Sequence, residues 1–225
     1  MTFYPVYLTQ LDRKPVILLG GNDEAERKTC ELLAFGARVH VISKKITAAM
    51  EHWWHEGQIQ WTPRTYRYGD LKDAGFVVAA EYSMETAKTA SNEANERNLL
   101  INVMDNIPLS NSAFGSVVRQ GKLTLSLSTS GLAPALTVRL KERLQHEIDA
   151  AYGEFLVLAD TLRPVIMSSG LDADERKAKW YEWVDSEVIP LLRNGQRRAA
   201  LEITARIWGS DLVEKAIPES VVDSA

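Results

Sequence analysis

The sequence of 225 residues contains one cysteine, Cys30, so it cannot form a disulfide within itself. It also lacks a run of about 20 apolar residues, the length that a helix needs to cross a bilayer. Its first residues do not form the apolar core of a secretory signal. Free thiols persist in reducing compartments. We therefore expect a cytoplasmic protein without a membrane anchor, and we expect Cys30, inside a predicted helix, to be a buried structural thiol.

An excess of positive charge is absent as well. The chain has 26 Lys and Arg against 30 Asp and Glu, a formal net charge of −4. This balance argues against general nucleic-acid binding, which needs a basic surface. An anionic ligand must therefore be held by local groups rather than by the overall field.

Histidine is scarce, with four residues in the chain. His146 has no second histidine or cysteine at ligand spacing. His52 and His55 lie beside tryptophans and have no carboxylate partner in the pattern, so we expect them to be surface or packing residues. From these residues we predict no metal site.

The most informative segment of the sequence is a glycine turn near the N-terminus. Residues 16–19 are four apolar residues in a row, which is typical of a strand buried on both faces. Gly20 and Gly21 end this run, and helix-forming residues continue through residues 24–35. Because a helix N-terminus leaves backbone N–H groups unpaired, a strand, a glycine turn and a helix in this order predict a phosphate-binding unit.

This turn matches the dinucleotide fingerprint G-x-G-x-x-G/A in part. Gly20 stands at the first position and Ala25 at the last, where a small residue lets helix and strand pack closely. Asn22 replaces the second glycine; it tolerates φ > 0 better than most residues, but its side chain narrows the approach to a pyrophosphate. The alternative is an ordinary strand–helix turn. The predicted cofactor contacts here are Gly20, Gly21, Asn22, Asp23, Glu24 and Ala25.

The second predicted strand, residues 38–42, ends without a carboxylate. An acidic residue at this place normally binds the ribose 2′-hydroxyl of NAD. Here the strand runs into Ser43, Lys44 and Lys45, so we predict Ser43 and Lys44 as cofactor contacts and leave NADP open. The alternative for the lysines is ordinary solvated surface charge.

Further strands alternate with helices as far as residue 103. Strands are predicted at residues 59–62, 76–80 and 99–103. Helices are predicted at residues 46–56 and, capped by Ser83, as far as residue 97. This alternation predicts an α/β fold with a Rossmann-type parallel sheet, whose strand ends share one edge. Asp105 follows the last of these strands and is therefore expected in the ligand crevice, although an aspartate there is also a common turn former.

The pattern changes after residue 111. Residues 122–128 alternate between apolar and polar, and a helix is predicted from Pro134 towards residue 152, with an apolar stripe at every fourth position. Helices follow at residues 154–167, 172–189 and 196–208. We predict three parts: a dinucleotide-binding domain at 1–113, a dimerisation region at 114–152 and a helical domain at 153–225. We accordingly expect a homodimer.

Taken in order, these motifs resemble one family, the precorrin-2 dehydrogenases and sirohydrochlorin ferrochelatases of sirohaem synthesis. The matching pieces are residues 19–21 with 25–28, 36–39, 102–105, 128–136, 139–144 and 175–180. The resemblance implies an NAD-dependent dehydrogenase of a tetrapyrrole, with Asp105 as the catalytic residue. It also implies that the serine-rich turn at residues 128–134 lies at the active site.

The tetrapyrrole implied as substrate carries many carboxylates. Arg119 and Arg139, with Lys122 and Arg143 nearby in the sequence, are candidates to bind them because guanidinium groups match carboxylates. Ser128, Ser130 and Gly131 precede a helix N-terminus, which could hold a carboxylate. The alternative for the cations is an ordinary charged helix face.

The sequence departs from the family pattern at two places. Asn22 replaces a glycine, and residues 79–83 read Ala-Ala-Glu-Tyr-Ser where the family usually has Ala-Ala-Thr-Asp-Asp, so the contacts around the cofactor ribose are expected to differ. Two other functions stay open: a bifunctional enzyme in which Asp105 also serves iron insertion, and a non-catalytic nucleotide sensor. The enzymatic interpretation requires an open glycine turn with Asp105 facing the same hollow.

Overall fold

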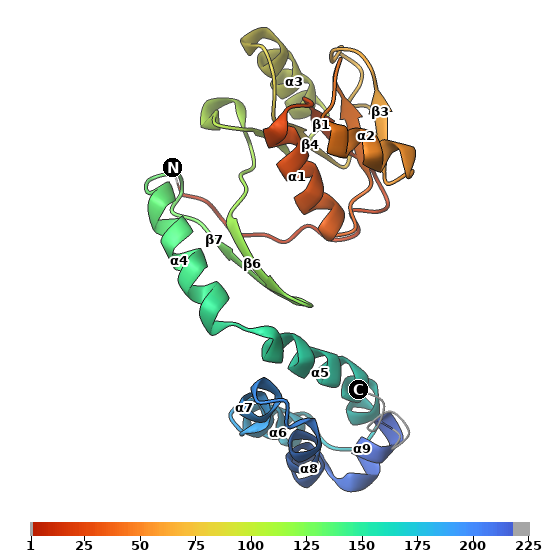
Figure 1. Ribbon diagram of the computed structural model, residues 1–225, viewed down its shortest axis with the longest axis vertical. Coiled ribbons are helices and arrows are strands. Elements are labelled where there is room, and N and C mark those ends of the chain that lie inside the picture. The colour runs from red at the N-terminus through yellow and green to blue at the C-terminus, as the bar shows by residue number, and fades with distance from the viewer. Residues whose placement is uncertain (1, 218–225) are drawn as a thin grey trace. The chain divides into compact units, whose positions relative to one another are not determined.

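The computed structural model describes residues 2–217, and the chain divides into two compact units, Met1–Phe114 and Gly115–Ala225 (Figure 1). Each unit has its own apolar core. The division of the second unit into a dimerisation region and a helical domain stays a prediction.

The first unit contains a five-stranded parallel sheet in the order β3-β2-β1-β4-β5. The strands are β1 (Val16–Leu19), β2 (Val39–Ile42), β3 (Ile59–Thr62), β4 (Phe76–Ala79) and β5 (Ile101–Val103). The strand order reverses at β1, whose neighbours β2 and β4 lead outward in opposite directions. The predicted α/β fold with a Rossmann-type sheet is confirmed.

Helices cover both faces of this sheet because its central strands are apolar on both sides. All four residues of β1 and of β4 are buried. Ile17 and Leu19 pack with α3 (Met84–Glu96), whereas Val16 and Leu18 pack with α1 (Asp23–Ala34) and α2 (Ala48–His55). The carboxyl ends of the strands meet at one edge, since Leu19 is in register with Ile42 and Ala79.

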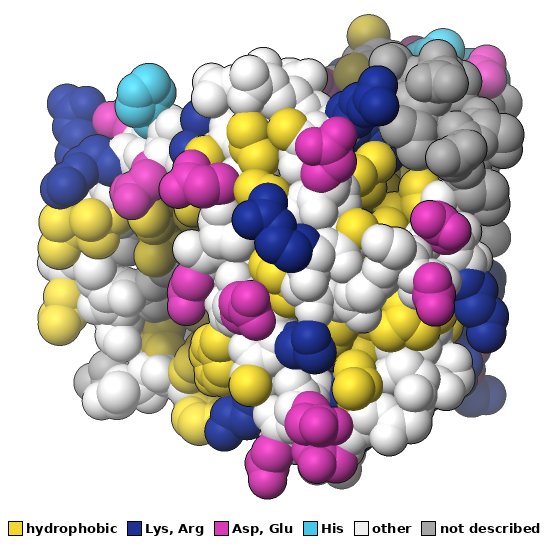
Figure 2. Space-filling model, turned by 90° about the horizontal axis from the view of Figure 1, so that it is seen from below, with side chains coloured by type: hydrophobic (Ala, Val, Ile, Leu, Met, Phe, Trp, Pro, Cys, Tyr) yellow, Lys and Arg dark blue, Asp and Glu magenta, His cyan; other side chains and the backbone are white. Residues whose placement is uncertain are grey.

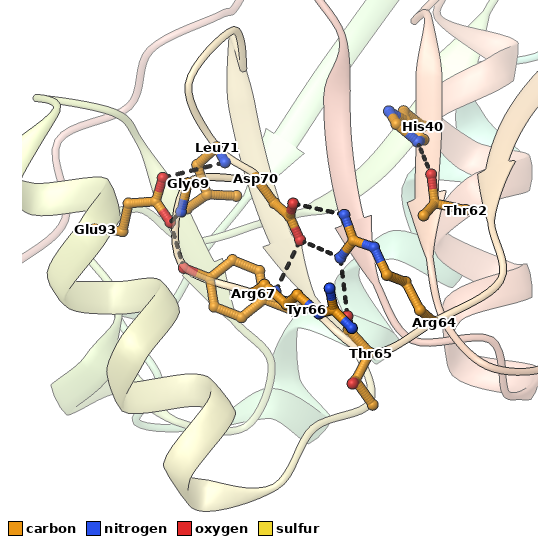
Figure 3. A network of polar contacts seen from close by, with 10 residues as sticks. All are labelled: His40, Thr62, Arg64, Thr65, Tyr66, Arg67, Gly69, Asp70, Leu71 and Glu93. Carbon is orange, nitrogen blue, oxygen red and sulfur yellow. Dashed lines mark hydrogen bonds and ion pairs between the residues drawn. The ribbon is translucent and has the colours of Figure 1, made fainter.

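A buried carboxylate fixes the connection between β3 and β4 (Figure 3). Glu93 of α3 is fully buried. Its oxygens accept hydrogen bonds from the Tyr66 hydroxyl and from the backbone N–H groups of Gly69 (2.8 Å) and Leu71 (3.2 Å), and its ion pair with Arg97 is 2.7 Å long. Burial alone raises the pKa of Glu93, but these hydrogen bonds outweigh burial and hold the pKa below its usual value. The network therefore ties the loop to α3 as long as Glu93 is charged.

The second unit begins with a hairpin and continues as helices. Strands β6 (Ser116–Gln120) and β7 (Leu123–Leu127) are antiparallel. The helices of the described part are α4 (Pro134–Glu147), α5 (Ala150–Met167), α6 (Ala173–Val184), α7 (Val188–Arg193), α8 (Arg197–Trp208) and α9 (Ser210–Ala216). The core of α5–α9 surrounds Trp183, whose indole N–H donates to the Thr204 hydroxyl at 2.9 Å.

Two of the predicted helices in this unit are wrong in extent. The helix predicted from Pro134 towards residue 152 ends at Glu147, because the Asp149 side chain caps a new helix by accepting the N–H of Ala151. The helix predicted at residues 172–189 divides into α6 and α7. The sequence analysis also missed α9 and the short 3-10 helix η1 (Ile107–Leu109).

The expected burial of Cys30 is wrong, since this residue is exposed. The buried positions of α1 are Ala25, Lys28, Thr29 and Leu32. Cys30 follows Thr29 by one residue, which turns its side chain about 100° around the helix and away from the sheet.

Side chains of both charge signs are mixed on the surface. On the face drawn in Figure 2, acidic and basic side chains lie interspersed with hydrophobic ones. This distribution agrees with the small net charge of −4. Among the helices within residues 2–217, none combines the length and the apolar character that crossing a membrane demands.

Candidate functional site

The glycine turn lies at the carboxyl end of β1, between β2 and β4. Gly20 has φ +123°, which a residue with a side chain rarely adopts, and its N–H donates to the carbonyl of Ile42 at 3.2 Å. The chain can therefore turn sharply from the strand into α1. This is the place in an open α/β sheet where ligands bind, at the point where strand order reverses.

Asn22 does not occupy the positive-φ conformation that the sequence analysis considered. Its φ is −83°, and it is the N-cap of α1, with its side-chain oxygen accepting the N–H of Ala25 at 3.0 Å. This bond satisfies one of the orphan donors of the helix. The Asn22 side chain is therefore fixed along the first helical turn.

The neighbours of Gly21 leave no room for a side chain at this position. A Cβ at this position would overlap the backbone carbonyl of Lys45 and would lie 2.9 Å from Oγ of Ser43. The structure thus brings Ser43, which follows β2, beside the turn; its contact with a cofactor stays a prediction. Lys44 is exposed.

A carboxylate that the sequence analysis did not assign to the site reaches the same turn. Glu81 follows β4, and its Oε2 accepts the N–H of Gly21 at 3.0 Å. The backbone N–H groups of Ala80 and Glu81 both donate to the carbonyl of Leu19, at 2.9 and 3.1 Å, which holds this segment against the end of β1. A Cβ on Gly20 would stand 2.6 Å from the Cβ of Glu81.

Asp105 lies between β5 and η1 and is exposed. Its φ is +59°, in the left-handed region that aspartate tolerates better than most residues. The charge of Asp105 affects the pKa of two groups from other parts of the chain. Burial, and after it the Asp105 carboxylate, raises the pKa of the Tyr82 hydroxyl; Asp105 also makes a minor contribution to the raised pKa of Arg27, whose main cause is the hydrogen bond to Glu24.

Tyr82 connects the segment after β4 to the segment after β5. Its hydroxyl donates to the backbone carbonyl of Met104 at 2.6 Å, one residue before Asp105. Tyr82 follows Glu81 directly, so one short segment contacts both the glycine turn and the neighbourhood of Asp105. From the sequence, residues 79–83 are known only to depart from the usual family sequence.

The turn fits a dinucleotide phosphate in part. The N–H groups of Asp23 and Glu24 begin α1 and have no carbonyl acceptor within the helix, as at any helix N-terminus. These two groups could bind a pyrophosphate, but their acidic side chains stand in the same turn. The N–H of Gly21 already donates to Glu81.

The serine-rich turn belongs to the second unit and precedes α4. Ser130 and Gly131 have φ of +53° and +79°. The N–H of Ser130 donates to Oγ of Ser128 at 3.0 Å, and the N–H of Ala133 donates to Oγ1 of Thr129 at 3.1 Å. The turn is thus shaped by its own hydroxyls, and no side chain caps α4.

The predicted carboxylate-binding cations of the second unit are exposed, but some already have protein partners. Arg119 donates to the carbonyl of Gly121 at 3.1 Å, and Arg139 pairs with Glu142 at 2.8 Å. Lys122 pairs with Asp160 at 2.7 Å. Arg143 and His146 are exposed on α4. A ligand carboxylate would have to compete with weak surface pairs at two of these positions.

Across residues 2–217, no group of three or more His, Cys, Asp or Glu side chains is arranged to hold a metal ion. His55, for which no carboxylate partner was expected, lies 4.0 Å from Glu51 one turn earlier on α2.

Comparisons with known proteins agree with this geometry. Residues 7–116 match the family model described as "Putative NAD(P)-binding". The chain is 28% identical over 200 residues to siroheme synthase 1 of Serratia proteamaculans, across 89% of this chain and 42% of that protein. It is 30% identical over 218 residues to the siroheme synthase of Xylella fastidiosa, across 96% of this chain and 45% of that protein. The chain thus spans less than half the length of these relatives.

A solved structure shares the fold. The structure of SirC, a precorrin-2 dehydrogenase, superposes with a TM-score of 0.74 at 24% identity, over 91% of this chain and 100% of that one. The sequence relatives reach into the second unit, beyond the nucleotide-binding segment. These matches support the family resemblance of the sequence, to the precorrin-2 dehydrogenases and sirohydrochlorin ferrochelatases of sirohaem synthesis.

Proposed function

We propose that this protein oxidises precorrin-2 to sirohydrochlorin, with NAD as the hydride acceptor. The observation that carries the proposal is the combination at one sheet edge of a glycine turn opening α1 with a carboxylate after β5. Support comes from the match to an NAD(P)-binding family model and from the sirohaem-pathway names of the relatives.

The first turn of α1 would bind the phosphates of the cofactor. The N–H groups of Asp23 and Glu24 would hold a phosphate oxygen, while Gly20 gives the backbone its close approach. We propose Ser43, which follows β2 and lies beside Gly21, as a contact of the adenosine ribose. The nicotinamide supplies the redox chemistry, and the chain supplies orientation and proton handling.

The choice of NAD over NADP rests on few contacts. The end of β2 offers the Ser43 hydroxyl and the exposed Lys44, without the carboxylate that usually selects NAD. A 2′-phosphate near Lys44 would be attracted by its charge. Comparing the two cofactors in the same assay is therefore part of the test.

We assign Asp105 the role of proton acceptor in the dehydrogenation. The reaction removes two hydrogens from the macrocycle, one as hydride and one as a proton. An exposed carboxylate at the sheet edge can take that proton within hydrogen-bond reach of the substrate. The Tyr82 hydroxyl, held by the Met104 carbonyl, is fixed beside this position and limits how the loop can move.

The carboxylates of the substrate need cationic and N–H donors. We propose Arg119, Arg139, Ser128, Ser130 and Gly131 for this purpose. In the second unit the two arginines are exposed and the serine turn opens α4, whose first N–H groups have no side-chain cap. On binding, each arginine would exchange its present surface partner, the Gly121 carbonyl for Arg119 and Glu142 for Arg139, for a substrate carboxylate.

A spectral assay tests the proposal. Purified protein is incubated anaerobically with precorrin-2 and either NAD or NADP, and the visible spectrum is followed. We expect conversion to sirohydrochlorin with NAD, and the reaction with NADP measures the effect of Lys44 and of the missing carboxylate at the end of β2. Absence of conversion with either cofactor would refute the proposal. Adding ferrous or cobaltous ion after conversion then shows whether the same protein also inserts a metal.

A further inference from the structure

We infer that Glu81 is a built-in competitor for the dinucleotide phosphate, so that this side chain sets the affinity for the cofactor. The inference rests on the proposed function and adds a residue to it. Its basis is the hydrogen bond from the Gly21 N–H to Glu81 Oε2, 3.0 Å long, at the turn that opens α1.

The backbone amide of Gly21 is part of the donor set of the phosphate site. In a glycine turn followed by a helix, consecutive N–H groups converge on one anion. Here the turn supplies the N–H groups of Gly21, Asp23 and Glu24, while that of Ala25 is taken by Asn22. With Gly21 bonded to Glu81, one backbone donor of the turn already has an anionic acceptor.

The backbone of Glu81 is fixed, whereas its carboxylate is held by the hydrogen bond from Gly21. Ala80 and Glu81 both donate to the Leu19 carbonyl, and the Glu81 Cβ abuts Gly20, so the residue cannot retreat from the turn. The residue is nevertheless exposed, so its carboxylate can rotate into solvent. A phosphate can therefore displace the carboxylate, but only by breaking a charge-assisted hydrogen bond.

Nearby negative charge also opposes phosphate binding, in addition to the hydrogen bond between Gly21 and Glu81. Asp23 and Glu24 add two carboxylates in the first turn of α1, and the positive end of the helix has to attract a phosphate past them. Arg27 is committed to Glu24 by two hydrogen bonds. Of these three acidic side chains, Glu81 is the one that accepts a hydrogen bond from the Gly21 amide, so neutralising it is expected to help phosphate binding most.

The test measures cofactor binding directly. NAD, ADP and adenosine are titrated calorimetrically into the wild type, Glu81→Gln and Glu81→Ala. We expect NAD and ADP to bind both variants about tenfold more tightly, a change of about 1.4 kcal/mol, while adenosine, which lacks phosphate, binds all three proteins equally. Glu85→Gln, at an exposed carboxylate four residues later, is the matched control and should leave all three affinities unchanged.

Other outcomes separate this inference from the proposed function. Equal NAD affinity in wild type and variants, with precorrin-2 still converted, overturns only the role of Glu81. Weaker NAD binding in Glu81→Gln also overturns it, because the carboxylate would then be a cofactor ligand. Tighter NAD binding without conversion of precorrin-2 supports the competitor and refutes the dehydrogenase. No dinucleotide binding to any of the three proteins refutes both.

Discussion

Asp105 combines an exposed carboxylate with a backbone at φ +59°. Asparagine tolerates this conformation as well as aspartate does, so Asp105→Asn removes the charge without straining the loop. We expect the rate of precorrin-2 oxidation to fall about 100-fold, the usual contribution of a general base, with NAD affinity unchanged. Single-turnover spectra and a NAD titration give the two quantities.

The control for this change is Asp73→Asn, an exposed aspartate before β4, away from the carboxyl ends of the strands. It should leave both quantities at the wild-type value. Loss of NAD binding in Asp105→Asn would instead mean that Asp105 shapes the cofactor site and does not accept a proton.

Gly21 is constrained by packing and not by its backbone angles. An added methyl group would overlap the Lys45 carbonyl, a backbone atom that cannot turn aside. We expect Gly21→Ala to lower the free energy of unfolding by about 1–3 kcal/mol, the usual cost of overpacking, and to weaken NAD binding because the turn shifts. Urea denaturation measures the first effect.

Gly153→Ala is a suitable comparison. Gly153 lies inside α5, where a new Cβ meets its nearest neighbour at an ordinary 3.5 Å. Alanine there should raise stability by about 0.5–1 kcal/mol through its better helix propensity. Equal effects of the two substitutions on stability would contradict the packing constraint at Gly21.

Single residues differ in how far the sequence reveals them. The positions of Gly20 and Asp105 follow from neighbours in the chain, because each comes within two residues of the end of a strand. The contact of Glu81 with Gly21 spans 60 residues and depends on β4 lying beside β1. Local pattern cannot predict that pairing, although the departure at residues 79–83 was a signal of unusual chemistry there.

At the scale of elements, continuous apolar runs were the most reliable signal. Such runs predicted β1 and β4 to within about one residue, since all four residues of each of these strands are apolar and buried on both faces of the sheet. Helix ends in the second unit were missed because they depend on caps. Asp149 starts α5 by bonding the N–H of Ala151, a contact that no periodicity reveals.

The network around Glu93 also links elements, joining α3 to the loop between β3 and β4. Glu93→Gln replaces one acceptor oxygen by a donor and leaves the Arg97 charge without its partner. We expect a loss of about 3 kcal/mol in the free energy of unfolding, as for other broken buried ion pairs. Glu96→Gln is the control, since Glu96 is exposed and its carboxylate accepts a hydrogen bond from the Tyr68 hydroxyl. This change should alter stability by less than about 0.5 kcal/mol.

The effect of Glu93 should depend on pH. The folded state holds the pKa of Glu93 below its usual value of 4.5, so the charged network contributes stability above that pH. As the pH falls through the folded-state pKa, the carboxyl becomes protonated and this contribution is lost. The stability difference between wild type and Glu93→Gln should therefore be constant from pH 6 to 8 and shrink below about pH 4. A difference that grows on acidification would contradict the assignment.

For the molecule as a whole, the sequence predicts a homodimer, and the surface of α4 supports this expectation. Leu136 is 51% exposed, and Leu132 just before the helix is 88% exposed. Leu140 and Leu144 continue the Leu136 stripe along α4 at every fourth residue and are partly exposed. Apolar side chains gathered on one element commonly mark an association surface. We expect light scattering after size exclusion to give twice the 25.2 kDa of one chain.

A substitution locates the contact. Leu136→Lys should raise the dissociation constant of the dimer at least about tenfold, because a charged side chain would be buried at the interface. Val157→Lys replaces an apolar residue on α5 that is 58% exposed and should leave association unchanged. A wild-type protein that stays monomeric at all concentrations would end the dimer expectation. A dimer weakened equally by both substitutions would place the interface elsewhere than on α4.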